Sequence, residues 1–401
     1  MENRFPMWLR VVDRPNATVF ATLSGADSFA RALIAGVLPL EAYRLLETAR
    51  AVSLMYTVIG LCTLMFSLFV PVLIRRVGRR WVYTTGCLLM VAAAALMALA
   101  ETAAFAGGVQ CRALAVVCTN IAINLYILDH IDKKDMIVAE PRRLLAIGVS
   151  WSIGPALGIW LHTNFGPLAV FGPSAAAALT TLAYFWALRL GENPAVPPMT
   201  RRPQNAFQNV WRFWSQPRLR LAWTIAFSRS THWTTFFVYP PMAIVASGGD
   251  ETLVAAMLAL AQGMLFLSPL AGRLGQRFGV RRMLMLAYGV AGTFALAAGI
   301  LPGQPGLGWS PWMTAALFVG AASGSMVLDA LGNIPFLRAV HPYERAEMAS
   351  VYRTYTETSQ LLPPAIYALV LTFFPLEAVF VVLGLQHLAT AWLATKVPHG
   401  L

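Results

Sequence analysis

Long apolar runs recur along the whole chain, and each can cross a lipid bilayer. A transmembrane helix needs about 17–25 predominantly apolar residues. Hydrophobic residues make up 58% of the 401 residues and charged residues only 12%, about half the charged share of a soluble domain. The sequence therefore predicts an all-α membrane protein with twelve transmembrane helices: Thr18–Leu40, Ala51–Ile74, Trp81–Leu99, Phe105–Leu128, Leu144–Leu161, Leu168–Leu188, Leu219–Ile244, Leu253–Leu274, Met283–Leu301, Trp312–Leu337, Met348–Phe373 and Ala378–Ala394.

The first run differs from a secretory signal peptide. Asp27 and Arg31 stand in its middle, and no small-residue cleavage site follows it. We therefore expect a retained transmembrane helix.

Several chemistries are excluded by the absence of their motifs. The chain has no Gly-x-x-x-x-Gly-Lys-Ser/Thr loop for nucleotide phosphates, no His, Cys and acid cluster at metal-ligand spacing, and no nucleophile elbow. We expect neither an enzyme nor an ATP-driven pump, and no metal or cofactor.

The net charge of +12 follows the predicted topology. Most of the 30 Lys and Arg residues fall in the termini and in the loops after even-numbered spans. Cytoplasmic loops carry such an excess of positive charge. Both termini are therefore expected in the cytoplasm, and the basic balance requires no nucleic acid as partner.

One long polar gap, Gly191–Pro217, divides six spans from six. We expect an N-terminal six-helix bundle over 1–190, a cytoplasmic linker over 191–217 and a C-terminal six-helix bundle over 218–401. Within the linker, Asn205–Ser215 places apolar residues at helical spacing, which predicts a short amphipathic helix on the membrane surface.

The two halves are repeats of one another. A basic string with a Gly between arginines, Arg75-Arg76-Val77-Gly78-Arg79-Arg80, recurs as Gln276-Arg277-Phe278-Gly279-Val280-Arg281-Arg282. At an offset of 202 residues Asp27 falls on Arg229 and Pro39 on Pro241. An even number of spans per repeat gives parallel repeats about an axis along the membrane normal.

These strings resemble the signature of the major facilitator superfamily between its second and third helices, roughly Gly-x-x-x-Asp-Arg-x-Gly-Arg-Arg, and the resemblance covers essentially the whole chain. It implies a twelve-helix transporter whose basic strings latch one conformation. The second copy keeps the first Gly, the Arg, the turn Gly and the trailing Arg pair and has Gln276 where the acid is expected, whereas the first has Pro71 for the Gly and Arg75 for the Asp. The conformational candidates in these strings are Arg76, Gly78, Arg79, Gly272, Gln276, Arg277 and Gly279.

A second resemblance lies in the fifth span. Ser150-Trp-Ser-Ile-Gly154-Pro155-Ala-Leu-Gly158 matches the Gly-x-x-x-Gly-Pro-x-x-Gly string of exporters in this family, apart from its first residue. Gly154 and Gly158 permit close helix approach, and Pro155 bends the helix. Two interpretations stay open, a role specific to export and a tight bend without directional meaning.

Ionisable residues inside spans are the strongest site candidates. A charge at mid-bilayer costs at least about 2.5–3.5 kcal/mol, so it faces a cavity or a partner. The resemblance implies that helices one, four, seven and ten line the central cavity. We expect Asp27 to be the coupling proton site, with Arg112 as its charge neighbour and Asp329 as second choice. Asp27 and Arg31 are four residues apart on one helix face, so they could also form a structural ion pair.

The remaining candidates are expected along a substrate cavity. Arg229 could hold an anionic or zwitterionic substrate or serve as the counter-ion of Asp329, and both alternatives stay open. Glu357 stands four residues after Arg353, a spacing that also fits a structural ion pair. The cavity candidates are Arg31, Asn120, Asn124, Arg229, His232, Trp233, Gln262, Asn333 and Glu357.

The function predicted from these patterns is secondary active transport by alternating access. The fifth-span string favours proton-coupled export of a small organic molecule by a monomer in the bacterial inner membrane. One alternative is uptake of a small anionic metabolite. Another is a protein of this fold that transports nothing and acts as a sensor or assembly factor.

The unequal basic strings predict an asymmetric latch. Arg277→Ala should shift the accessibility of cysteines engineered on the two membrane faces more than Arg76→Ala does, because the second string keeps more of the signature. Thiol-labelling rates measure this accessibility, and equal effects of the two substitutions would contradict the prediction.

Overall fold

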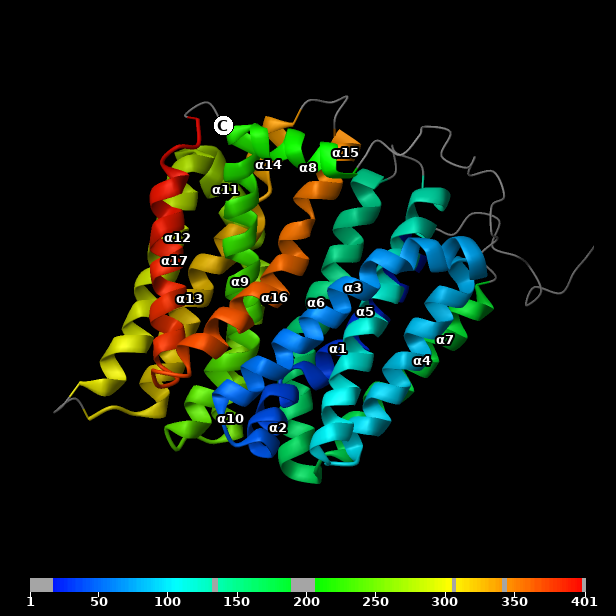
Figure 1. Ribbon diagram of the computed structural model, residues 1–401, viewed down its shortest axis with the longest axis horizontal. Coiled ribbons are helices and arrows are strands. Elements are labelled where there is room, and N and C mark those ends of the chain that lie inside the picture. Colours follow the sequence, from blue (N-terminus) through cyan, green and yellow to red (C-terminus); the bar gives the residue numbers. More distant parts are fainter. Residues whose placement is uncertain (1–16, 132–135, 189–205, 305–307, 341–344, 399–401) are drawn as a thin grey trace, which may run out of the picture. The chain divides into compact units, whose positions relative to one another are not determined.

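The computed structural model describes residues 17–131, 136–188, 206–304, 308–340 and 345–398, and within these ranges every regular element is helical (Figure 1). The first helices are α1 (Ala17–Ala35), α2 (Val37–Leu46), α3 (Ala49–Val77), α4 (Arg79–Ala98), α5 (Thr102–His130), α6 (Met136–Phe165) and α7 (Leu168–Ala187). They are followed by α8 (Ala206–Ser215), α9 (Pro217–Ala246), α10 (Glu251–Gly263), α11 (Ser268–Phe278), α12 (Val280–Ile300), α13 (Pro311–Leu331), α14 (Ile334–Ala339), α15 (Arg345–Tyr352), α16 (Thr354–Val370) and α17 (Ala378–Ala394).

The described helices support the all-α membrane class. Nine helical stretches in these ranges are long and apolar enough to cross a membrane. The seventh, eleventh and twelfth predicted spans are not among them. Helix α9 carries three arginines and many hydroxyl side chains, the eleventh span is divided at Arg353 into α15 and α16, and α17 has only 17 residues. Twelve spans in two repeats therefore stay a prediction.

The chain forms two compact units. The first contains the described parts of Met1–Ile34 and Cys62–Thr200, and the second contains Ala35–Leu61 with the described parts of Arg201–Leu401. Contacts thus group α2 and the start of α3 with the C-terminal half, although the sequence assigns them to the first bundle. The division at 1–190, 191–217 and 218–401 stays a prediction.

Specific contacts join Ala35–Leu61 to the second unit. Helix α2 packs against α9. The Ser53 hydroxyl lies 2.8 Å from that of Tyr239, with both side chains buried. Gly60 lies so close to α16 that a Cβ atom added there would be 3.1 Å from the Gln360 backbone oxygen. A hydrogen bond and a glycine contact therefore join α3 to this unit.

Each basic string turns at its glycine. Gly78 between α3 and α4 has φ 88° and ψ 153°, and Gly279 between α11 and α12 has φ 86° and ψ 140°. Only glycine adopts this region without strain, because it lacks a Cβ atom. The same backbone turn thus occurs at the same place in both copies of the string.

A seam of small residues joins α1 and α6 in the first unit. The Ser150 hydroxyl donates to the Gly25 backbone oxygen at 2.9 Å. A Cβ atom at Gly154 would lie 2.5 Å from that of Ala32, and one at Gly158 would overlap the Leu33 backbone oxygen. Small side chains let helix backbones approach this closely, so the fifth-span string builds a tight helix contact.

In the second unit, α9 is the central helix. It packs against α13, α16 and α17, which surround it (Figure 1). The short helix α8, close to the segment expected to be amphipathic, buries Phe213 completely against the start of α9 and leaves Trp211 78% exposed. Because α13, α16 and α17 all pack against α9, the polar and charged side chains of α9 are positioned by contacts with three helices.

Gly158→Ala should lower the thermal stability of the detergent-solubilised protein strongly, because the new methyl group would overlap the α1 backbone. Overpacking of this kind costs about 1–3 kcal/mol or more. Gly148→Ala is the matched control on the same helix, since a Cβ atom there meets no neighbour within 4 Å. It should leave the melting temperature unchanged or raise it slightly. Equal destabilisation by both substitutions would show that the seam is not tight.

Candidate substrate and proton sites

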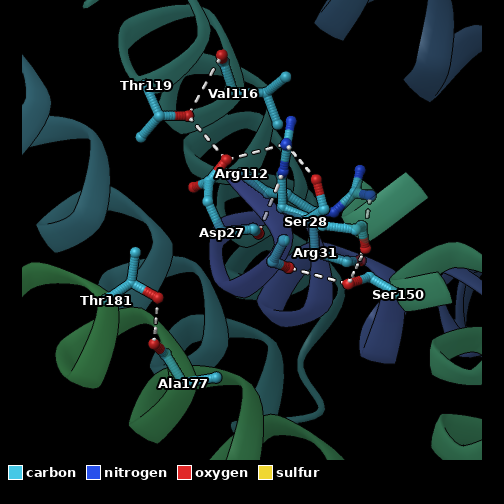
Figure 2. Close-up of polar contacts among 11 residues, drawn as sticks. Asp27, Ser28, Arg31, Arg112, Val116, Thr119, Ser150, Ala177 and Thr181 are labelled. Carbon is cyan, nitrogen blue, oxygen red and sulfur yellow. Dashed lines mark hydrogen bonds and ion pairs between the residues drawn. The ribbon is translucent and has the colours of Figure 1, made fainter. Parts of the chain in front are cut away.

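Asp27 and Arg31 form an ion pair within one turn of α1 (Figure 2). The Oδ2 atom of Asp27 and the Nη2 atom of Arg31 are 2.8 Å apart, and the side chains are 13% and 12% exposed. The guanidinium also donates to the Ser28 hydroxyl at 3.2 Å and to the Asp27 backbone oxygen at 3.3 Å. Because the pair lies four residues apart on one helix, its local geometry follows from the sequence spacing.

Helix α5 adds two contacts to this cluster (Figure 2). The Thr119 hydroxyl donates to the carboxylate of Asp27 at 3.4 Å, and Arg112 NH2 donates to the Arg31 backbone oxygen at 3.4 Å. The structure thus brings together Asp27, Arg31 and Arg112, which the sequence predicted as neighbours. Two arginines and one aspartate give this cluster an excess of positive charge.

Asn120 and Asn124 lie on the same helix but outside the described contacts of this cluster. Asn120 is exposed and Asn124 is half-buried. Their assignment to a substrate cavity stays a prediction. Thr119 was missed, because a lone threonine in an apolar span gives no signal that separates it from a packing residue.

The second unit carries an ion pair between two helices. Arg229 on α9 lies 3.7 Å from Asp329 on α13, measured from Nε to Oδ1. The indole nitrogen of Trp233 donates to the other carboxylate oxygen at 2.8 Å. Arg229 NH2 donates to the Tyr355 hydroxyl of α16 at 3.0 Å. Arg229, Trp233 and Asp329, all predicted site residues, therefore share one cluster.

Tyrosines extend this cluster toward α14. The Tyr352 hydroxyl donates to the side-chain oxygen of Asn333 at 3.0 Å. The ring of Tyr352 stacks on Phe336 at 3.9 Å and meets the ring of Tyr355 edge-on. Asn333, another predicted site residue, is thus linked to Arg229 through two aromatic side chains.

The two predicted repeats carry opposite charges at positions that the sequence aligns. Asp27 of α1 aligns with Arg229 of α9, since 229 − 27 gives the offset of 202. On the helices that complete each cluster the signs are again opposite, with Arg112 on α5 and Asp329 on α13. In chain order, the acid of α1 precedes the arginine of α5 in the first unit, and the arginine of α9 precedes the acid of α13 in the second, although α1 also carries Arg31.

His232 does not belong to the ion pair. Its Nδ1 atom is 3.0 Å from Nε2 of His387 on α17, and the Nδ1 atom of His387 is 3.0 Å from the Ser228 hydroxyl. Both rings are buried, at 1% and 0% exposure. A neutral imidazole has one donor and one acceptor nitrogen, so the hydrogen bonds order the two tautomers together.

His387 is a candidate site residue that is absent from the sequence predictions. It is an ionisable residue in the middle of an apolar helix, which makes it a site candidate by default. No neighbour in the sequence marks it as part of a pair, because its partners Ser228 and His232 lie on α9, more than 150 residues away.

Two further cavity candidates lie outside these contacts. Gln262 of α10 is buried at 3% exposure. Glu357 lies in the first turn of α16, where the charge of Arg353 acts on its carboxyl group. The proposed pairing of Arg353 with Glu357 is thus compatible with the structure, and the role of both candidates stays a prediction.

The conformational candidates of the basic strings differ in exposure. Arg76, Gln276 and Arg277 are exposed, and Arg79 is half-buried. The guanidinium of Arg277 lies 5.4 Å from the ring of Phe278. Arg80 in the first string lies 3.8 Å over the ring of Trp186 on α7, so the first string has the closer cation–π contact.

Comparison with known proteins identifies a matching protein family and solved structures of similar fold. The model of the Major Facilitator Superfamily matches residues 20–362. No curated protein matches this sequence. Among solved structures, the nucleoside transporter NupG has a TM-score of 0.70 at 13% identity and covers 95% of this chain and 98% of its own.

Two structures of POT family transporters show the same likeness. An auto-inhibited POT family peptide transporter has a TM-score of 0.67 at 15% identity, covering 94% of this chain and 95% of that chain. A POT family transporter in complex with 5-aminolevulinic acid has a TM-score of 0.70 at 12% identity, covering 94% of both chains. At these identities the likeness shows the fold alone.

The two histidines should be coupled in stability. His387→Phe leaves the buried His232 ring without its hydrogen-bond partner, at a cost of about 1–3 kcal/mol. His232→Phe removes one of the two hydrogen bonds of His387, which keeps its contact with Ser228. The double variant should be more stable than the sum of the single effects predicts, by about 0.5–3 kcal/mol. Chemical denaturation followed by tryptophan fluorescence measures this difference. Additive effects would mean that the hydrogen bond contributes nothing.

Proposed function

Because this chain belongs to the Major Facilitator Superfamily, we propose that it exports a small organic molecule across the bacterial inner membrane in exchange for protons. Membership makes it a multi-pass membrane transporter, and its solved relatives in fold are transporters as well. The direction of transport, the coupling ion and the membrane are parts of the proposal.

The observation that carries proton coupling is the paired carboxylate in each unit. Asp27 and Asp329 lie in helices of largely apolar composition, and each has an arginine within 4 Å. A proton bound to either carboxylate cancels its charge and weakens the ion pair. Arg112 of α5 donates to the backbone of Arg31, and Thr119 of α5 donates to Asp27. Protonation of Asp27 therefore also changes the contacts between α1 and α5. We assign the coupling proton to Asp27 first and to Asp329 second.

The α1–α6 seam supports a link between that proton and conformation. Gly25 and Asp27 lie on the same turn of α1, and Gly25 accepts the hydrogen bond from Ser150 of α6. A change in the position of α1 must therefore move the seam, because Gly154 and Gly158 leave no room between the helices. This gives the fifth-span string a mechanical role in the transport cycle.

The proposed topology follows from the charge distribution. Both termini and the linker are cytoplasmic, because most of the Lys and Arg residues fall on that side. The transporter is a monomer of two six-helix bundles that rock about a site near the middle of the membrane. Uptake of an anionic metabolite remains the second candidate, since the clusters hold three arginines.

Asp27→Asn should uncouple transport from protons. Metabolites inside and outside cells that lack or overproduce the protein identify the solute and its direction, and its flux is then measured in proteoliposomes with an imposed pH gradient. The proton-driven part of the flux should fall about 5- to 150-fold, the range that coupling free energies of about 1–3 kcal/mol represent. Asp329→Asn should have a smaller effect on coupling.

The matched control is Asp250→Asn. Asp250 caps α10 by accepting a hydrogen bond from the Leu253 backbone nitrogen, and asparagine caps helices equally well. Its flux should equal that of the unchanged protein. Proton-driven flux that survives Asp27→Asn would overturn the coupling assignment, and a solute that accumulates inside overproducing cells would favour uptake.

A further inference from the structure

Asp329 is held by unequal contacts. Its Oδ2 atom accepts a hydrogen bond from Trp233 at 2.8 Å, whereas Oδ1 is 3.7 Å from the Arg229 Nε atom. The second distance is too long for a hydrogen bond, so Arg229 attracts the carboxylate through its charge alone. The same guanidinium donates to Tyr355. One oxygen of Asp329 thus keeps most of its capacity to accept hydrogen bonds.

The acid is also the more accessible member of the pair. The side chain of Asp329 is 26% exposed and that of Arg229 is 10% exposed. In the first unit the exposures of Asp27 and Arg31 are nearly equal, and the atoms are 2.8 Å apart. A charged ligand that reaches the second cluster therefore meets a carboxylate before it meets the guanidinium.

Trp233, which contacts this carboxylate, belongs to a row of aromatic side chains along α9. Trp233 is half-buried, and its ring lies 6.1 Å from that of Phe237, one turn further along α9. Earlier on the same helix, Trp223 and Phe227 are half-buried and stack at 5.2 Å with an angle of 5° between their planes. Helix α9 thus presents several aromatic rings that its own unit leaves half-covered.

We propose that Asp329 and Trp233 bind the ammonium group of an organic amine, an inference that rests on the proposed export of a small organic molecule. The ammonium donates to the Asp329 Oδ1 atom and lies against the indole face, which attracts cations. The apolar part of the amine packs against the aromatic side chains of α9. Arg229, held by Tyr355, limits the negative charge of the empty site.

A substrate anion fits this cluster less well. It would approach the exposed carboxylate first and be repelled by it, and the donors of Arg229 already face Asp329 and Tyr355. The charge that the second cluster selects is therefore positive. Zwitterions that carry an ammonium group are included in the class.

The test uses the purified full-length protein and tritiated 2-phenylethylamine in equilibrium dialysis. 2-Phenylethanol and phenylacetate serve as competitors of similar shape with neutral and negative charge. The amine should bind, and neither competitor should displace it at equal concentration. Asp329→Asn should weaken binding about tenfold or more, a loss equal to about 1.4 kcal/mol. Asp329→Glu should retain most of the affinity, because it keeps the charge.

Asp250→Asn is again the control and should bind like the unchanged protein. Melting temperatures measured on the same samples separate loss of the site from loss of the fold. Trp233→Phe adds a variant that keeps an aromatic ring but removes the indole donor and part of the ring face. It should weaken binding less than Asp329→Asn. Displacement by phenylacetate, absence of amine binding, or unchanged binding by folded Asp329→Asn protein would each overturn the proposal.

The inference and the proposed function fail in different ways. If proteoliposomes export a solute that has no amine, the proposed function stands and the amine site is wrong. If the amine binds through Asp329 but no solute moves under a pH gradient, the site stands and the proposed function is wrong.

Discussion

The charges inside this protein's apolar helices need partners, and that requirement organises both units. A lone charge in hydrocarbon costs several kcal/mol, so Asp27, Arg31, Arg229 and Asp329 occur in pairs, each with further polar contacts. The pairs are retained although apolar side chains of similar volume would often be as stable. These ionisable groups cost stability and lie in the helices expected to line a cavity, so they are the strongest candidates for binding protons or a charged substrate.

The two units meet this requirement with different degrees of rigidity. In the first, Asp27 is enclosed by contacts from α1 and α5, and the small-residue seam fixes α1 against α6. In the second, Asp329 has one close hydrogen bond, from the half-buried Trp233, and an arginine 3.7 Å away. A closely paired carboxylate suits a proton, which needs no space. A loosely paired one suits a larger cation, which must displace an existing interaction.

The sequence predicted what depends on local spacing. The Asp27–Arg31 pair, the glycine turns of the basic strings and the short helix α8 follow from residues close together in the chain, and the apolar runs gave the membrane class. It could not supply contacts between distant segments. The partnership of His232 with His387, the grouping of Ala35–Leu61 with the C-terminal half and the break at Arg353 depend on which helices pack together. Arg229 with Asp329 lay between these cases, since both charges were candidates but their pairing was one of two alternatives.

The placement of the two ion pairs also matters while the chain is being made. Asp27 and Arg31 share one helical turn, so α1 can enter the bilayer already neutralised. Arg229 stands on α9, the helix whose composition falls short of a membrane span, and its acid arrives only at position 329, after α10, α11 and α12 have been synthesised. The ribosome therefore delivers an arginine long before its counter-charge. Until α13 has been made, the charge of Arg229 lacks its counter-charge, which raises the free-energy cost of moving α9 into lipid.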